Sequence, residues 1–444
     1  MLDHLREVLL GEGEAASLPE EGRRRFLARW QQFTAPVTAK AMEDTAFYRY
    51  IPLLSLNEVG GDPRSFGVSA AAFHFANQTR QRHRPHCLLG TSTHDSKRGE
   101  DLRARLDVLS EAPAQWEDCL LRLSGWANLY LTRTPSADWP GNNAIWLLFQ
   151  TLVGLWPALP PDDDQREVLR QRVQATMRKA VREAKVHTTW ICPDSDYENA
   201  VERYVDGVLR PGASPFADEL QKFTARIAPF GFRNSLAQLA LKFTAPGVPD
   251  LYQGCEQWNF SLVDPDNRRS VDYAALARDL EDVQALYSQG FPSEPQWAAL
   301  NANAADGRIK QLVTWRLMRL RRERSTLFRD ANYLALAVEG PAAEHAVAYA
   351  RICEREAVLV VVARLTWTLC RGDDDAWMPS LWSDTRVRCG PEGGVRRFRH
   401  WRNWLTGAPA ELATGEDAAL DLQSLFRGAG GLPFAVLVAQ VETA

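Results

Sequence analysis

The segment TSTHDSKRGEDLRARL, residues 91–106, contains residue types that suit glycosyl-transfer chemistry. Glycosyl transfer passes through an oxocarbenium-like transition state, and a fixed carboxylate such as that of Asp95 can stabilise the positive charge on the sugar ring. The imidazole of the adjacent His94 can donate a hydrogen bond to a sugar hydroxyl. A His-Asp pair also fits a structural role, because Asp95 or Ser96 could cap the helix that follows.

The elements expected around this segment favour the catalytic interpretation. The apolar stretch from Cys87 to Gly90 predicts a strand before it, and residues 99–109 predict a helix after it, with acidic residues in the first turn. Residues 232–254 repeat this pattern, with a helix ending near Phe243, a turn, and a short buried strand in VPDLYQG. Alternating helices and strands are typical of an α/β barrel, which places catalytic groups in the loops that follow its strands.

The rest of the chain divides into helical and strand-forming parts. Residues 2–42 predict helices with an apolar stripe, residues 110–245 are nearly all helical in pattern, and residues 307–322 predict another amphipathic helix. After about residue 330 the pattern changes to strands. The expected strands are AVAYARIC (346–353), EAVLVVVAR (356–364) and PFAVLVAQV (433–441), which predict an antiparallel β domain.

Composition excludes several classes of protein. The net charge of −4 and the pI of about 6.1 argue against a nucleic-acid-binding protein, which usually has a basic excess. The seven cysteines are scattered without a C-x-x-C pair, which fits a reducing compartment better than a disulfide or zinc scaffold. No signal-peptide core and no membrane-spanning window occur, so we expect a cytoplasmic protein that does not enter a membrane.

Four separated blocks, in the right order, resemble the malto-oligosyltrehalose synthase family of the α-amylase superfamily. The first block is THDSKRGEDLRARL, which looks like the family's T-H-D-T-K-R-x-E-D-x-R-A-R motif, with Ser96 at the place of the second threonine. The others are KAMEDTAFYRY (40–50) followed by SLNEVGGDP (55–63), KAVREAKVHTTWICPDSDYE (179–198), and APGVPDLYQGCEQWNFSLVDPDNRRSVDY (245–273). The resemblance runs from about residue 25 to the C-terminus and is weakest after residue 330.

The resemblance implies an α/β fold, the C-terminal portion of a TIM (β/α)8 barrel with a large helical insertion, followed by an antiparallel β domain. The expected parts are residues 1–109, a partial barrel with the His-Asp motif; 110–230, the helical insertion; 231–329, the last barrel strand and helices; and 330–444, the β domain. The implied reaction is an intramolecular transglycosylation in trehalose biosynthesis. It converts the reducing-end α-1,4 bond of a maltodextrin into an α,α-1,1 bond, without a cofactor or metal.

The resemblance also implies roles for single residues. Asp95 matches the transition-state stabiliser, and His94 matches the histidine that contacts the sugar at the cleavage site. Other candidates for substrate contact, each with a structural alternative, are Lys97 and Arg98 (or salt bridges to Glu100 or Asp101), Phe47 and Tyr48 (or barrel packing), and Trp190, Trp258 and Phe260 (or core). His187 either lines the pocket or caps the helix that ends near Lys185, and Asp44 is expected to pair with Lys40, Arg49 or Arg98.

Two catalytic carboxylates of the superfamily have no match in this sequence. A retaining enzyme needs a nucleophile and a general acid, and residues 1–90 contain neither segment; GFRNS (231–235) has Asn234 and Ser235 where the nucleophile would stand. We therefore expect the chain alone to be inactive, as one half of a split enzyme completed by a separate N-terminal polypeptide or as a fragment of a longer gene product. The alternatives are another glycosidase of the superfamily and a non-catalytic glucan-binding subunit.

Overall fold

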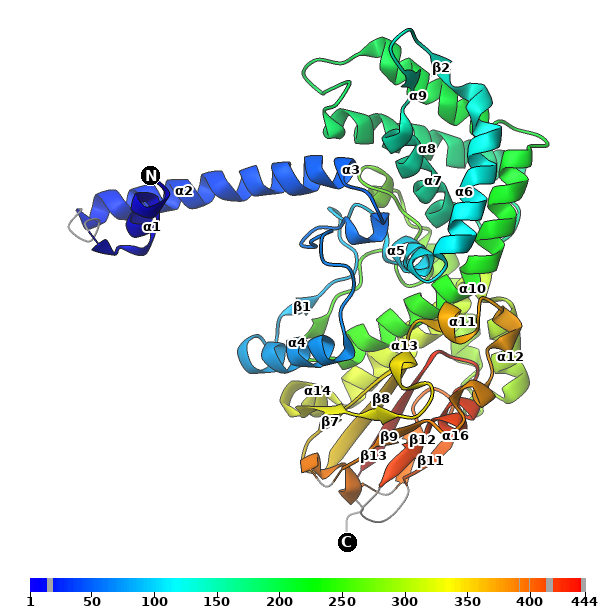
Figure 1. Cartoon of the computed structure of the whole chain (residues 1–444). Coiled ribbons are helices and arrows are strands. Elements are labelled where there is room, and N and C mark those ends of the chain that lie inside the picture. The colour runs from blue at the N-terminus through cyan, green and yellow to red at the C-terminus, as the bar shows by residue number, and fades with distance from the viewer. Residues whose placement is uncertain (14–18, 391, 399, 413–417, 441–444) are drawn as a thin grey trace.

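The computed structural model places a helical region above a β domain, with a long N-terminal helix extending away from both (Figure 1). It describes residues 1–13, 19–390, 392–398, 400–412 and 418–440. Within these residues, no helix combines the length and the apolar character that crossing a membrane requires.

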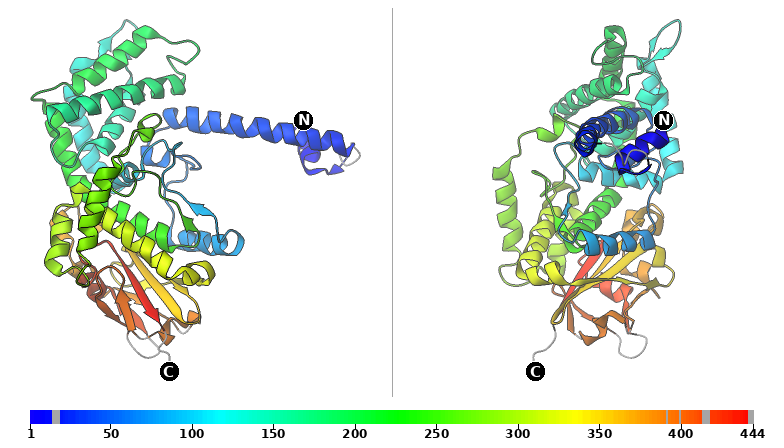
Figure 2. Two further views of the ribbon diagram at one scale, coloured as in Figure 1. Left: turned by 180° about the vertical axis from the view of Figure 1, so that it is seen from behind. Right: turned by 90° about the vertical axis from the view of Figure 1, so that its left-hand side faces the viewer.

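The two N-terminal helices, α1 (Leu2–Leu10) and α2 (Glu20–Ala41), form as the sequence predicts, but neither buries a side chain. The left view in Figure 2 shows α2 standing clear of the rest of the chain. Its apolar residues, such as Phe33, therefore face solvent instead of a core. A five-residue π-turn (Met42–Ala46) and the short α3 (Phe47–Arg49) lead from α2 into the folded body.

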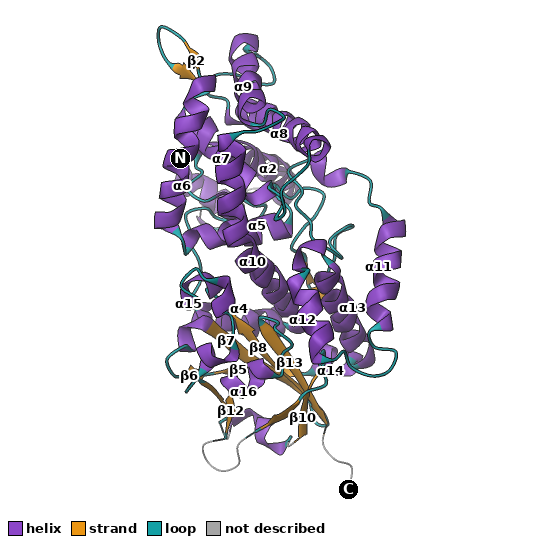
Figure 3. Cartoon of the chain, turned by 90° about the vertical axis from the view of Figure 1, so that its right-hand side faces the viewer, coloured by secondary structure: helices purple, strands orange, loops and turns teal. Residues whose placement is uncertain are grey.

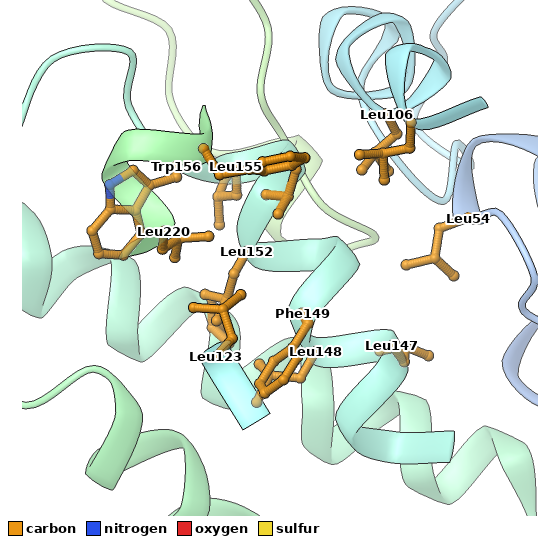
Figure 4. Close-up of a cluster of buried hydrophobic side chains, with 14 of the residues drawn as sticks. Leu54, Leu106, Leu123, Leu147, Leu148, Phe149, Leu152, Leu155, Trp156 and Leu220 are labelled. Carbon is orange, nitrogen blue, oxygen red and sulfur yellow. The ribbon is translucent and has the colours of Figure 1, made fainter. Parts of the chain in front are cut away.

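A bundle of helices forms the upper region and buries the first hydrophobic core. Its helices are α5 (Glu100–Asp107), α6 (Pro113–Ala127), α7 (Asn142–Leu155), α8 (Asp163–Ala184), α9 (Ser195–Val208) and α10 (Pro215–Thr244). Figure 4 shows α7 at the centre, where Phe149 and Leu152 pack against residues of neighbouring helices. Gly154 permits the close contact with α5, because a Cβ atom there would lie 2.6 Å from the Cδ2 atom of Leu102. A small hairpin, β2 (Thr132–Arg133) and β3 (Asp138–Trp139), joins α6 to α7.

The C-terminal region forms the predicted antiparallel β domain, seen below the bundle in Figure 3. Its six-stranded sheet has the order β11 (Pro409–Glu411), β10 (His400–Asn403), β13 (Phe434–Gln440), β8 (Glu356–Ala363), β7 (Ala346–Ile352), β5 (Asn332–Leu336). A second sheet has the order β12 (Ala419–Asp421), β9 (Arg386–Arg388), β6 (Val338–Glu339). The predicted strand residue 441 lies outside the described residues.

Both faces of the six-stranded sheet are buried, which explains why its central strands are apolar throughout. Along β8, Val358 and Val360 belong to a core shared with helices, whereas Leu359 and Val361 belong to a core on the side of the smaller sheet. The remaining helices are α4 (Ala70–His83), α11 (Tyr273–Ala285), α12 (Glu294–Ala302), α13 (Arg308–Glu323), α14 (Ser325–Asp330), α15 (Thr366–Leu369) and α16 (Leu422–Arg427).

One parallel pair is present where the sequence predicts barrel strands. β1 (Leu88–Leu89) pairs with β4 (Val248–Pro249), with Leu88 opposite Val248. The expectation of a buried strand in VPDLYQG is wrong, because Val248 is 39% exposed and Leu88 is 72% exposed. These strands lack cover because, among the described residues, each pairs only with the other. The described residues therefore do not form a closed barrel.

Candidate functional site

The loop between β1 and α5 presents the His-Asp pair to solvent. The Asp95 side chain is 63% exposed, and its carboxylate lies 3.3 Å from His94 Nε2 and 3.7 Å from Arg268 Nη2. The helix-cap alternative is wrong, because Ser92 Oγ accepts the N–H of Glu100 at 2.9 Å, whereas Ser96 Oγ accepts the N–H of Thr93. The carboxylate is thus accessible, flanked by an imidazole and a guanidinium.

Side chains distant in the sequence fix the backbone of this loop. Asn267, in the loop after β4, donates through Nδ2 to the carbonyl of His94 at 2.9 Å and also contacts the carbonyls of Thr93 and Ser96. On the other side, the Glu58 carboxylate accepts the backbone N–H groups of Lys97 (2.8 Å) and Arg98 (3.1 Å). These hydrogen bonds, from Asn267 and to Glu58, hold the backbone on either side of Asp95.

Asp266 in turn orders the loop that carries Asn267. Arg172 of α8 donates to both carboxylate oxygens of Asp266, at 2.8 and 2.9 Å, and the N–H of Leu262 donates to it at 2.7 Å. Burial would raise the pKa of Asp266, but the hydrogen bonds from Arg172 and the N–H of Leu262, together with the charges of Arg172 and Arg269, lower it. The contacts of Asp266 and Asn267 in the polar run after β4 therefore have a structural role.

A buried ionic cluster anchors the first turn of α5. Lys310 of α13 is fully buried, and its Nζ lies 2.7 Å from Glu100 Oε1 and 2.7 Å from Asp101 Oδ2. Lys242 of α10 approaches Glu100 at 3.3 Å, and Thr91 at the start of the loop donates to the same carboxylate. The cluster ties the beginning of the loop to three helices.

The charges in this cluster depend on one another. Burial alone would raise the pKa of Glu100, but the charges of Lys310 and Lys242 prevail and lower it to about 2. Asp101 shares only Lys310, so burial and the charge of Glu100 raise its pKa. Burial would lower the pKa of Lys310, but the two carboxylates raise it above its ordinary value.

Lys97 and Arg98 are oriented inward rather than toward the exposed face of Asp95. Lys97 Nζ pairs with Asp44 Oδ1 at 2.9 Å, and not with Glu100 or Asp101. Asp44 also pairs with Lys40 at 2.5 Å, as predicted; burial would raise the pKa of Asp44, but these lysines lower it. Arg98 is buried, and its Nη1 lies 3.5 Å from the carbonyl of Asn57. Direct sugar contact by these two residues stays a prediction, and their partners within the chain indicate a positioning role.

Phe47 and Tyr48 are both buried, in agreement with the packing alternative. Tyr48 lines a hollow of about 160 Å³ together with His187 and Tyr197, whose rings lie 4.6 Å apart. Burial raises the pKa of Tyr48, and its hydroxyl has no hydrogen-bond partner among the described residues. His187 therefore lines this hollow, and its place in the active-site pocket stays a prediction.

The side chains of the three aromatic candidates, Trp190, Trp258 and Phe260, contact residues other than His94 and Asp95. Trp190 is about half exposed and donates to Glu183 at 2.8 Å. Trp258 stacks on Phe232 at 4.7 Å and donates to the carbonyl of Ala304. Phe260 lies under the guanidinium of Arg105 at 4.1 Å. Trp258 and Phe260 pack against the hydrophobic cores, and Trp190 retains an exposed face.

Sequence reasoning missed Glu58, Asn267 and Lys310 as residues that position the loop. Asn267 lies in the run DPDNRR (264–269), whose polar residues give no sign of their partners. Lys310 offered one signal, because it occupies the apolar side of its helix between Ile309 and Leu312, where a lysine requires buried partners. Glu58 offered no local signal. No cluster of three or more metal-ligating side chains occurs in the part of the chain that the structure describes.

Comparisons with known proteins identify relatives for most of the chain, although no protein-family model matches it. Two curated proteins of Mycobacterium tuberculosis, strains CDC 1551 / Oshkosh and ATCC 25618 / H37Rv, are each named "Putative maltooligosyl trehalose synthase" and are 37% identical over 394 residues. The match covers 89% of this chain and 44% of each relative. Maltooligosyltrehalose synthase from Arthrobacter ramosus is similar in structure, with a TM-score of 0.74 and 33% identity over 96% of this chain and 48% of that one. The chain thus spans about half the length of the relatives it matches.

Proposed function

The chain is a homologue of maltooligosyl trehalose synthases that corresponds to roughly half of the full-length enzyme, and from this we propose that it supplies one half of such an active site. In this proposal Asp95 stabilises the oxocarbenium-like transition state and His94 binds a sugar hydroxyl. The reaction would isomerise the terminal α-1,4 bond of a maltodextrin to an α,α-1,1 bond.

The observation that carries the proposal is the combination of an exposed carboxylate with a rigid loop. Asp95 is accessible, yet its peptide is held on both sides by Asn267 and Glu58. Its side-chain partners, His94 Nε2 at 3.3 Å and Arg268 Nη2 at 3.7 Å, are more distant than those of a structural carboxylate such as Asp266, whose partner Arg172 lies at 2.8 Å. Preorganisation of this kind is what stabilisation of a developing charge requires.

We further propose that β1 and β4 belong to a partial TIM barrel that a second polypeptide or segment completes. Each strand pairs only with the other among the described residues, and both expose apolar side chains. In this proposal residues 1–109 belong to the partial barrel and residues 110–230 to the helical insertion, and α10 (Pro215–Thr244) continues from the insertion into the part that follows. The nucleophile and general acid would come from the completing part.

Complementation tests the proposal. The chain is co-expressed with the part of the Arthrobacter ramosus enzyme that it does not match, and maltopentaose is the substrate. We expect a product without a reducing end from the mixture and none from this chain alone. Maltose and glucose as the products would instead support a hydrolase, and glucan binding without turnover in the mixture would support a non-catalytic subunit.

Substitution of the central carboxylate gives the sharper test. Asp95→Asn should lower kcat of the complemented enzyme about 100- to 1,000-fold, because it removes the fixed negative charge. The melting temperature should not change, since the side chain is exposed and its ion pairs are weak. Asp118→Asn, an exposed residue of α6, is the matched control and should leave kcat unchanged. Full activity of the Asp95→Asn enzyme would refute the assignment.

A further inference from the structure

The long helix α2 carries an apolar stripe that nothing in the described part of the chain buries. Phe26, Trp30, Phe33 and Val37 follow one another at steps of four, three and four residues, which places them on one side of the helix. Phe33 is 64% exposed, and no residue of α2 is buried. Helices in proteins owe most of their stability to the packing of such a face, so the stripe indicates a missing contact.

Other uncovered apolar side chains lie on the same side of the molecule as α2. Figure 1 shows α2, β1 and α4 together on the left, and the view from behind in Figure 2 agrees. Phe75 of α4 and Leu88 of β1 are exposed, as are Phe66 and Val68 in the segment before α4. We refer to these four residues and the α2 stripe as the open side. Exposed apolar side chains gathered in this way mark an interaction surface.

The strand pair β1 and β4 indicates the kind of partner that would cover the open side. Each strand has two residues, the pair is parallel, and neither strand has a second neighbour among the described residues. Parallel strands are connected by helical crossovers, and parallel sheets are covered by helices on both faces. A sheet this small also needs more strands to be stable. The partner should therefore supply both parallel strands and helices.

A second copy of this chain meets this requirement less well than a different polypeptide. A copy would add only the same two short strands, and its own open side would need cover as well. The relatives are long enough to hold a further set of elements, because the match covers only 44% of the Mycobacterium tuberculosis proteins and 48% of the Arthrobacter ramosus enzyme. The unmatched half of such an enzyme is the partner that the open side fits.

We propose that α2 is a docking arm: its apolar stripe packs against a polypeptide with the fold of that unmatched half, and strands of the same polypeptide pair with β1 and β4. The identity of the partner rests on the proposed function, whereas the exposure of the stripe does not. Docking would also act on the active site. α2 joins the folded body through the π-turn that contains Asp44, and Asp44 pairs at 2.9 Å with Lys97, which stands two residues after Asp95.

Hydrogen exchange of the α2 amides tests the contact directly. The 444-residue chain is co-expressed with the tagged unmatched half of the Arthrobacter ramosus or the Mycobacterium tuberculosis protein, and the complex is purified through the tag. In the free chain the α2 amides should exchange quickly, since no packing protects the helix. In the complex we expect their exchange to be at least about tenfold slower.

A charge placed in the stripe tests the same contact through affinity, measured from the dissociation of the purified complexes on dilution. Phe33→Asp should weaken the complex at least about tenfold, because docking would bury an unpaired carboxylate. The matched control is Leu121→Asp, because Leu121 is 67% exposed on α6, which lies on the other side of the molecule from α2 (Figure 1). This control should keep the wild-type affinity. Val37→Asp replaces Phe33→Asp if that variant lowers the melting temperature of the free chain.

Three results would overturn the proposal: no complex with either half, a complex in which the α2 amides exchange as in the free chain, or a Phe33→Asp complex as tight as that of the control. Protection of α2 in a dimer of the chain alone would identify a second copy as the partner instead. The proposed function fails separately. A complex that protects α2 but gives no non-reducing product from maltopentaose would refute the function, whereas an active complex with unprotected α2 would refute only the docking arm.

Discussion

Removal of Lys310 should expose how strongly the buried cluster supports the His-Asp loop. Lys310 is the shared partner of Glu100 and Asp101, each at 2.7 Å, and it also donates to the carbonyl of Gln257 at 3.0 Å. Lys310→Met keeps most of the volume and removes the charge. Glu100 then retains Lys242, at 3.3 Å, and the hydroxyl of Thr91, whereas Asp101 retains no lysine.

The expected loss is about 3–5 kcal/mol in the free energy of unfolding, the range for breaking a buried ion pair by removing one partner. The loss should depend on pH. In the wild type the lowered pKa of Glu100 stabilises the fold fully above the ordinary pKa of glutamate, and this contribution disappears as the pH falls toward about 2. In the variant the carboxyl groups of Glu100 and Asp101 should both have raised pKa values, because their buried charges have lost Lys310. The cost of burying these charges in the folded state is largest above about pH 4.3 and decreases as the groups become protonated. The difference between the two proteins should therefore shrink on acidification from about pH 7 to about pH 4.

Urea unfolding at both pH values measures this difference, and hydrogen exchange of the α5 amides reports it locally. Lys222→Met, an exposed lysine of α10, is the matched control and should change stability by less than about 0.5 kcal/mol. A loss of less than about 1 kcal/mol at pH 7, well under the usual range, would refute the reasoning. A large loss that does not change with pH would refute the assignment of charge to the two carboxyl groups.

Two further variants test the loop after β4. Asn267→Ala should destabilise the chain by about 1–3 kcal/mol, because the part-buried carbonyl of His94 loses its donor at 2.9 Å. The variant should also lower kcat of the complemented enzyme. An unchanged kcat would show that Asn267 does not position the loop. Asp266→Asn should remove stability that the wild type has above the ordinary pKa of aspartate and loses as the pH falls, since the bonds to Arg172 lower the pKa of Asp266. Urea titrations of both proteins between about pH 3 and about pH 6 would contradict this if the difference did not decrease toward the acidic end.

The sequence by itself determined the local elements of this protein. Apolar periodicity predicted many of the long helices and three strands of the β domain, β7, β8 and β13, because a helix or strand that faces a core must repeat its apolar residues at 3.6 or 2 positions, or be apolar throughout when both faces are covered. The helix after the motif begins at Glu100, within one residue of the expected limit. The same local pattern indicated His94 and Asp95 as candidates, since a loop between a strand and a helix consists of consecutive residues.

Only the tertiary structure decided which side chains surround that loop. Lys310 and Asp101 are 209 positions apart and Asn267 and His94 are 173, so no local pattern could pair them. Likewise, an apolar strand such as Leu88–Leu89 has the same sequence pattern whether or not other elements cover it. Its exposure depends on how many strands lie beside it. Local sequence sets the preferred backbone conformation, whereas burial and charge pairing depend on packing between distant segments. The hydrogen bonds of Asn267 and Glu58 that hold the backbone beside Asp95 depend on such packing.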